Sequence, residues 1–260
     1  MTESDDDEED DVENESVFLS LNPITNASGS AYVQLGLSGN ENFDDDEFDG
    51  GKKTTKIFVS VFGPKKTTTR QQDERVSKTR GTIDVSVKVA SFATKTRAIS
   101  SSVSSASLSD VEIDFTEKVA KCLRGVVVLE SFPKAVVEVR CVVADAHGDE
   151  LRGLILAASA ALMHARVETR DVLCACTAVI DEDGEVRLVE DYNNSSSGGR
   201  KTSKNKKAVG AVTVAYMPRV KKVTNILSVG RWENANDLKK AEEVAMDGCE
   251  SVAEIIKAAF

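Results

Sequence analysis

Histidine is the scarcest of the residues that commonly carry chemistry, because His147 and His164 are the only two in 260 residues. A histidine-rich metal site is therefore excluded, and a triad that depends on histidine has few candidates. No apolar run reaches the roughly 18 residues that a membrane-spanning helix needs. The first fifteen residues are too acidic for a signal or transit peptide, so we expect no membrane association and no export.

Cysteine is also sparse, and its distribution argues against a disulfide framework. The five cysteines are an odd number and lie dispersed in apolar stretches, at Cys122, Cys141, Cys174, Cys176 and Cys249. This usage suits a reduced intracellular compartment. Cys174 and Cys176 share one face of a strand, but the chain has no second pair with zinc spacing. We expect all five to be packed core thiols.

The net charge of −10 is not spread evenly along the chain. Residues 1–15 contain ten acidic residues and no basic one, and residues 41–49 contain six more, again without a base. The other 27 acidic residues are outnumbered by the 33 lysines and arginines, which leaves a net charge of about +6 on the rest of the chain. The sequence predicts a basic globular body with an acidic tail at 1–15 and an acidic loop insertion at 37–53.

The first third of the chain shows the pattern of an antiparallel sheet. Residues 17–21, 29–36, 56–62 and 83–89 read as strands, and the last of these alternates apolar and polar residues with period two. Gly63-Pro64 is a turn signal that we expect to end the third strand. Residues 29–36 and 55–62 are predicted to form a hairpin around the acidic insertion.

The remaining two thirds alternate helices and strands. A helix is predicted from Val111 to Leu129 after a serine-rich loop at 100–109, and a buried helix over 151–165. Further strands are expected at 135–144, 172–180, 185–189, 211–217 and 220–229, with a polar loop at 193–207. A closing helix over 236–260 should turn these residues inward: Ala241, Ala245, Val252, Ile255 and Ile256. The order predicts one α+β domain over 16–260, with mixed sheets packed against helices.

Six phrases in this order resemble the RNase PH family. They are Gly-Ser-Ala-Tyr-Val at 29–33, Ser-Val-Phe-Gly-Pro at 60–64, Leu-Arg-Gly-Val-Val-Val-Leu at 123–129 leading to Pro133, Val-Ala-Asp at 143–145, Arg-Asp-Val-Leu-Cys-Ala-Cys at 170–176 and Val-Ala-Tyr-Met-Pro at 214–218. The resemblance covers residues 16–260 and implies the RNase PH-like fold, a ribosomal protein S5 domain 2-like arrangement. Within the family the chain is most similar to subunits of the eukaryotic RNA exosome core ring, above all to the mRNA transport regulator subunit, followed by the core subunit of archaeal exosomes.

Active members of this family degrade RNA from its 3′ end by phosphorolysis, and the chain departs from them at three places. Where they carry a Gly-Gly-Thr-Arg turn for phosphate, this chain has residues 146–150, Ala-His-Gly-Asp-Glu. A carboxylate about 4 Å from a phosphate repels it by about 4 kcal/mol at an effective dielectric near 20. The arginine that opens their first long helix falls at Val111. Their paired acids fall at Val189 and Ser195, although Asp191-Tyr192 is retained.

Two neighbouring residues leave the phosphate site open to more than one interpretation. Arg152 follows the altered turn closely and could swing in to bind an anion. His147, within the turn, could act as a general base, but no nucleophile in a glycine-flanked elbow accompanies it, so a surface position is favoured. His164 is expected at the boundary of the buried helix. The glycine pair 198–199 precedes basic residues and no helix, which favours a surface loop over a phosphate loop.

Basic runs are the main sign of a binding function. Phosphate contacts with RNA are predicted for Lys65, Lys66, Arg70, Arg80, Lys95 and Arg97, and a solvated surface explains such runs equally well. Aromatic residues are scarce near them, with Phe92 the nearest, so base stacking is not indicated. Any contact with RNA should follow the phosphate backbone without sequence readout.

By this resemblance, the chain is expected to be a non-catalytic structural subunit in a six-membered ring of paralogues, with no cofactor and no metal. Its expected partners are the other ring subunits, cap subunits with S1 and KH domains, a hydrolytic nuclease and RNA, in the nucleus, nucleolus and cytoplasm. Two alternatives remain: an active phosphorolytic exoribonuclease, and a free-standing nuclear factor with the same fold. The acidic segments either solubilise the chain, compete with RNA or engage a basic partner.

Overall fold

The computed structural model describes residues 17–36, 54–66, 79–93, 105–189, 208–232 and 234–260, without the side chains of 105–108. Nine strands, three α-helices and one 3-10 turn occupy these ranges. The strands are β1 (Val17–Leu21), β2 (Gly29–Gly36), β3 (Thr54–Lys66), β4 (Thr82–Val89), β5 (Ala135–Asp145), β6 (Cys174–Asp181), β7 (Val186–Leu188), β8 (Ala208–Met217) and β9 (Lys222–Gly230). The helices are α2 (Ser105–Val126), η1 (Leu129–Ser131), α3 (Glu150–His164) and α5 (Ala235–Ala258).

The first sheet is mixed, in the order β1-β2-β3-β5-β4. Strands β2 and β3 pair antiparallel from Gly29 opposite Val61 to Gly36 opposite Thr54, which confirms the predicted hairpin. Strand β4 runs parallel to β5, with Thr82 opposite Val136. A parallel neighbour requires a long connection, and here α2 supplies it.

The turn expected at Gly63-Pro64 is wrong, because β3 continues through it to Lys66. The register between β3 and β5 shifts between Phe62 and Lys65, after which Lys65 and Lys66 pair with Val136 and Ala135. Gly63 sits in this irregularity at φ +116°, and a Cβ there would lie 2.7 Å from the carbonyl oxygen of Val136. The residues Gly63-Pro64, which the sequence predicted to form a turn, therefore lie in a β-bulge.

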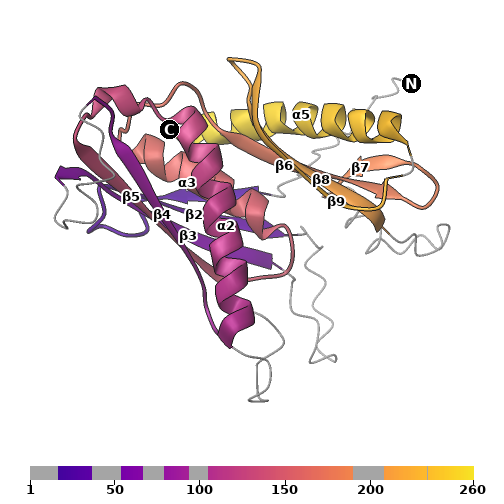
Figure 1. Ribbon diagram of the computed structural model, residues 1–260, viewed down its shortest axis with the longest axis horizontal. Coiled ribbons are helices and arrows are strands. Elements are labelled where there is room, and N and C mark those ends of the chain that lie inside the picture. Colours follow the sequence, from indigo (N-terminus) through magenta and orange to yellow (C-terminus); the bar gives the residue numbers. More distant parts are fainter. Residues whose placement is uncertain (1–16, 37–53, 67–78, 94–104, 190–207, 233) are drawn as a thin grey trace, which may run out of the picture.

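The second sheet is antiparallel, in the order β7-β6-β8-β9, so the expected pairing of the last two strands is confirmed. It lies beside the first sheet with α3 between the two, while α5 runs along its outer face (Figure 1). Every residue of β6 is buried. Successive side chains of this strand face α3 and α5 in turn, which explains why it reads as continuously apolar.

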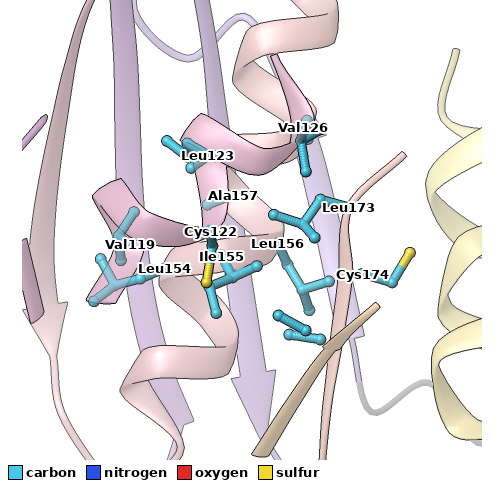
Figure 2. Packing of buried hydrophobic residues seen from close by; sticks show 14 of the residues in the cluster. Val119, Cys122, Leu123, Val126, Leu154, Ile155, Leu156, Ala157, Leu173 and Cys174 are labelled. Atoms are coloured by element: carbon cyan, nitrogen blue, oxygen red, sulfur yellow. The ribbon is translucent and has the colours of Figure 1, made fainter. Parts of the chain in front are cut away.

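Helix α3 is the centre of the core, as its all-round apolar sequence predicts. Residues 151–162 are all buried, and α3 packs against β2, β3 and β6. Figure 2 shows Leu154, Ile155 and Leu156 of α3 next to Val119 and Leu123 of α2, with Leu173 on the side towards β6. One continuous hydrophobic cluster therefore joins both sheets and all three helices.

Two expectations about the helices are wrong in detail. Helix α2 begins at Ser105, inside the segment expected to be a loop. Val111 is 44 % exposed, and the carboxylate of the next residue, Glu112, accepts a hydrogen bond from the N–H of Val89, the last residue of β4. Earlier residues of α2 therefore extend past the sheet. In α5, Ala241, Ala245, Val252 and Ile256 are buried as expected, but Ile255 is 38 % exposed.

All five cysteines are free and buried, so the expectation of core thiols is confirmed. Burial raises the pKa of both Cys141 and Cys174 to about 12. Within the described ranges, none of the helices is long and apolar enough to cross a membrane.

Candidate functional site

The turn between β5 and α3 is the part of the fold where the sequence places the altered phosphate-binding segment. The hydroxyl of Thr55 on β3 donates to the carbonyl of Gly148 (2.8 Å) and accepts from the N–H of His147 (3.1 Å). Gly148 has φ +106°, a conformation that L side chains rarely adopt. The turn is thus held to the first sheet and projects its next residue, Asp149, towards the second.

Asp149 is the central group of the site. It is the N-cap residue of α3, at φ +59°, yet its side chain makes no capping hydrogen bond. Instead, its Oδ1 accepts a hydrogen bond from the hydroxyl of Thr177 on β6 (2.6 Å). The side chain is 14 % exposed, and burial raises the pKa of the carboxyl, although the charge of Arg152 and the Thr177 hydroxyl partly oppose the shift. The carboxylate is therefore an internal group that bridges α3 to the second sheet.

Arg152 is the cation of the site and is itself 3 % exposed. Its Nε donates to the carbonyl oxygen of Ala175 on β6 (3.2 Å), and its Nη1 lies 3.5 Å from Oδ2 of Asp149. The sequence left open whether Arg152 could bind an anion at this turn. The anion that it meets in the structure is the chain's own Asp149.

Further donors at the turn are also taken by the chain itself. The N–H of Gly148 donates to Oε1 of Glu150 (2.9 Å), and the hydroxyls of Thr177 and Thr213, opposite each other on β6 and β8, lie 2.9 Å apart. A phosphate at this turn would need backbone N–H groups, hydroxyls and an arginine. Here the carboxylate of Glu150 accepts from a backbone N–H group, and the carboxylate of Asp149 accepts from a hydroxyl and faces the arginine.

The histidines do not form a catalytic pair. His147 is more enclosed than expected, with an 18 % exposed side chain whose Nε2 lies 3.1 Å from Oδ1 of Asp145. His164 lies at the end of α3 as expected, where its Nδ1 accepts a hydrogen bond from the N–H of Ser30 (3.1 Å). Each histidine is thus committed to a local structural contact.

Of the other positions that depart from active family members, the two that the structure describes, Val111 and Val189, add no ligand to the turn. Val111 lies on the part of α2 that extends past the first sheet. Val189 directly follows β7, and Ser195 lies outside the described residues. Among the side chains that the structure describes, no group of three or more potential metal ligands occurs.

Sequence reasoning missed one buried acid, Asp181, at the end of β6. It is 3 % exposed, and neither side-chain oxygen has a hydrogen-bond partner among the described contacts. Its N–H donates to the carbonyl of Glu185 across the β6–β7 turn (3.1 Å). Because Asp181 stands in an Asp-Glu-Asp-Gly segment, the sequence suggested a solvated turn and gave no sign of burial.

The predicted RNA-contact residues are only partly available for phosphate. Lys65 pairs with Glu138 (2.8 Å), whose pKa is lowered chiefly by this hydrogen bond, and Arg80 pairs with Glu130 (3.1 Å). Lys66 is exposed at the end of β3. Arg70, Lys95 and Arg97 lie outside the described residues. Two of the six predicted cations are therefore neutralised by carboxylates.

Aromatic side chains lie closer to the basic residues than the sequence suggested. Phe62 packs under the guanidinium of Arg140, 5.2 Å from ring centroid to carbon, and Arg140 shares Glu138 with Lys65. Phe18, Tyr32 and Phe58 form an aromatic stripe across β1, β2 and β3, with centroid distances of 6.2 and 4.7 Å. Ile57 packs against Gly153 of α3, so the stripe lies on the opposite face of the sheet. The stripe was missed because its members come from three separate strands.

Comparison with known proteins agrees with this architecture. The chain is 24 % identical over 247 residues to "Exosome complex component RRP41-like" of Arabidopsis thaliana, covering 92 % of this chain and 77 % of the relative. It is 28 % identical over 229 residues to "Exosome complex component MTR3" of Chaetomium thermophilum, covering 81 % and 71 %.

Solved structures share the fold. Rice (Oryza sativa) Rrp46 superposes with a TM-score of 0.65 at 16 % identity, covering 93 % of this chain and 92 % of that one. The Archaeoglobus fulgidus exosome with RNA bound to the active site gives a TM-score of 0.61 at 19 % identity, covering 92 % and 87 %. The model of the RNase PH family, described as "3' exoribonuclease family, domain 1", matches residues 13–168, and the chain belongs to this family.

Proposed function

We propose that this chain is a non-catalytic structural subunit of an RNA exosome core ring, which supports 3′ to 5′ RNA degradation by assembly and by contact with RNA. One observation carries the proposal. The carboxylate of Asp149 sits at the turn where active family members bind phosphate, and it takes the Thr177 hydroxyl (2.6 Å) and faces Arg152 (3.5 Å). Phosphorolysis needs inorganic phosphate at this place, and a carboxyl group that already holds the hydroxyl and faces the arginine competes with it for these donors.

The relatives and neighbours support the assembly part of the proposal. Both MTR3 and RRP41-like proteins are named as exosome components, and the solved neighbours include archaeal exosome cores. We extend this to the chain and infer that its partners are RNase PH-like paralogues, with the cap and nuclease subunits joined through them.

Exposed apolar surface gives such partners a place to bind. Phe18 is 53 % exposed at one end of the aromatic stripe, on β1, an edge strand of the first sheet. Strand β9 is an edge of the second sheet and exposes Val223, Ile226 and Val229. Large exposed apolar side chains beside unpaired strand edges are costly in a solitary protein and typical of assembly surfaces.

The experiment that tests assembly is purification of the tagged chain from its own cells under native conditions. We expect RNase PH-like paralogues to be recovered in stoichiometric amounts after gel filtration. Two variants are purified in the same way. Val229→Glu places a charge on the exposed edge of β9 and tests whether this edge is needed for recovery of the paralogues. Glu117→Gln changes an exposed carboxylate of α2 and serves as the control. Recovery of the chain alone, as a monomer, would favour a free-standing factor instead.

A second candidate function is the active phosphorolytic exoribonuclease, and Asp181 is the observation that favours it. A buried carboxylate without a hydrogen-bond partner is unusual, and acids of this kind take part in metal-assisted or acid–base chemistry. This reading predicts phosphate-dependent release of nucleoside diphosphates from RNA by the purified chain, lost in Asp181→Asn. Absence of release from the wild-type chain, alone and with its paralogues in which catalytic acids are substituted, excludes it.

A further inference from the structure

Three segments that are distant in the sequence meet at one end of the molecule. The N–H of Arg170 donates to the carbonyl of Val126, at the end of α2 (2.9 Å). The next residue, Asp171, accepts hydrogen bonds from the N–H groups of Arg219 (2.7 Å) and Val220 (3.0 Å), at the turn between β8 and β9. A Cβ on Gly125 would lie 3.4 Å from the Thr224 side chain, so the end of α2 also packs against β9.

Each of these segments contributes exposed cations. We call them the hairpin basic cluster: Lys121, Arg124, Arg170, Arg219, Lys221 and Lys222. Lys121 and Arg124 lie in the last turns of α2, Arg170 on the connecting segment, and the other three around the β8–β9 turn. Figure 1 shows this turn projecting at the edge of the molecule.

The cations of the cluster make no ion pair among the described residues, unlike several other surface cations of the protein. Lys56, Lys65, Arg80, Lys88 and Arg140 each lie within 4 Å of a carboxylate. Within the described ranges, no carboxylate lies that close to any member of the cluster. Asp171, the acid at its centre, is engaged with three backbone N–H groups, and Glu168 is exposed without pairing to these cations.

Six cations that make no ion pair outnumber the nearby acids Asp171 and Glu168 and repel one another, and a polyanion relieves that repulsion. Phosphate groups suit the cluster because three of its members are arginines, whose guanidinium groups bind phosphate through two parallel hydrogen bonds. The cluster contains no aromatic side chain, so it offers no platform for base stacking. A protein interface would need a wide apolar centre, and the described segments of the cluster expose only two large apolar side chains, Val220 (38 %) and Val223 (39 %).

We propose that the hairpin basic cluster binds the phosphate backbone of single-stranded RNA, at a surface separate from the β5–α3 turn and from the predicted contacts at Lys65 and Arg80. The proposal rests on the proposed function for the choice of RNA as the polyanion. Contacts of this kind position RNA without reading its sequence. The subunit would thus hold RNA by charge while leaving cleavage to another protein.

The test is RNA binding by the full chain with the cluster reversed in charge. Arg170→Glu/Lys221→Glu is compared with Arg231→Glu/Lys239→Glu, which changes the net charge equally at exposed positions outside the cluster. A fluorescent single-stranded RNA of mixed sequence is titrated by anisotropy at several salt concentrations. We expect the cluster variant to raise Kd at least tenfold and to lower the slope of log K against log salt by about 1.4, or about 0.7 for each lost phosphate contact. The control should match the wild type.

Three results would overturn the proposal: unchanged binding by the cluster variant, equal weakening in the control, or displacement of RNA from the wild-type chain by an acidic peptide of equal charge. If the double variant does not fold, Lys221→Gln alone replaces it, because Lys221 is exposed and lies in a turn. Recovery of paralogues with both variants is measured in parallel. Loss of RNA binding with intact recovery concerns this proposal alone, whereas failure to recover paralogues with the wild type concerns the proposed function.

Discussion

At the residue scale, Asp149 decides what the site can do. Two of the features that would attract phosphate, an arginine and a hydroxyl, contact this carboxylate instead. Arg152 is buried and also bonds to Ala175, so it is held in place by contacts on both sides. Its guanidinium therefore stabilises the chain's own fold at a position where it would otherwise be available to an external anion.

Asp149 also makes a prediction about pH. Because burial raises its pKa, the folded protein retains this proton to higher pH than the unfolded chain does. The resulting stabilisation is complete below the unfolded pKa, about 3.9, and is lost as pH rises through the folded pKa. Asp149→Asn cannot titrate, so the free energy of unfolding of the wild type relative to this variant should fall as pH rises above about 4.

Urea unfolding of both proteins at several pH values measures this difference. Each unit of upward shift in the pKa corresponds to about 1.4 kcal/mol between the two ends of the pH range. A wild type that instead gains stability relative to Asp149→Asn as pH rises would mean that the Arg152 charge outweighs burial.

At the element scale, the packing of α3 against β2 explains why the family phrase at 29–33 begins with glycine. A Cβ on Gly29 would lie 2.3 Å from the backbone nitrogen of Ala165, directly after α3. No real side chain tolerates that distance, and backbone atoms of a buried helix end cannot move aside cheaply. The start of β2 and the end of α3 are therefore matched to each other.

This packing predicts opposite effects for two glycine substitutions. Gly29→Ala should destabilise the protein by about 3 kcal/mol or more, because strand and helix must separate. Gly125→Ala, in the last turns of α2, meets only the Thr224 methyl at 3.4 Å and should stabilise by about 0.5–1 kcal/mol. Chemical denaturation measures both, and equal effects of the two changes would contradict the packing described.

Element types followed closely from the sequence, and the errors have physical causes. The alternation at 83–89 corresponds to β4, because a half-buried strand needs apolar residues on one face only. The apolar run at 151–165 corresponds to α3, because a helix buried on all sides needs apolar residues throughout. The start of α2 was missed because serines favour caps and turns, although here they lie within a helix. The continuation of β3 past Gly63-Pro64 was missed because a bulge and a turn have the same local residues.

The site was less predictable than the fold. The sequence placed an acid in the phosphate turn correctly, but it gave no reason to expect Asp149 to point at Thr177, 28 positions away. It also suggested exposed RNA contacts at Lys65 and Arg80, which pair with Glu138 and Glu130. Ion pairs between strands depend on register, and the aromatic stripe and hairpin basic cluster depend on topology, which periodicity does not reveal.

At the scale of the whole molecule, the protein combines a filled anion site with surfaces suited to assembly. The core is continuous across both sheets and three helices. Its edges at β1 and β9 expose apolar side chains, and the end formed by α2 and the β8–β9 turn exposes unpaired cations. This division of the surface fits a subunit that contributes contacts to a larger assembly while another protein supplies the chemistry.

The most direct measurement is diffraction from crystals of the chain soaked in inorganic phosphate or sulfate. We expect Asp149 to keep its contacts with Thr177 and Arg152, with no anion bound between Gly148 and Arg152. Density for an anion held at Gly148 and Arg152, with Asp149 displaced from Thr177, would contradict this expectation.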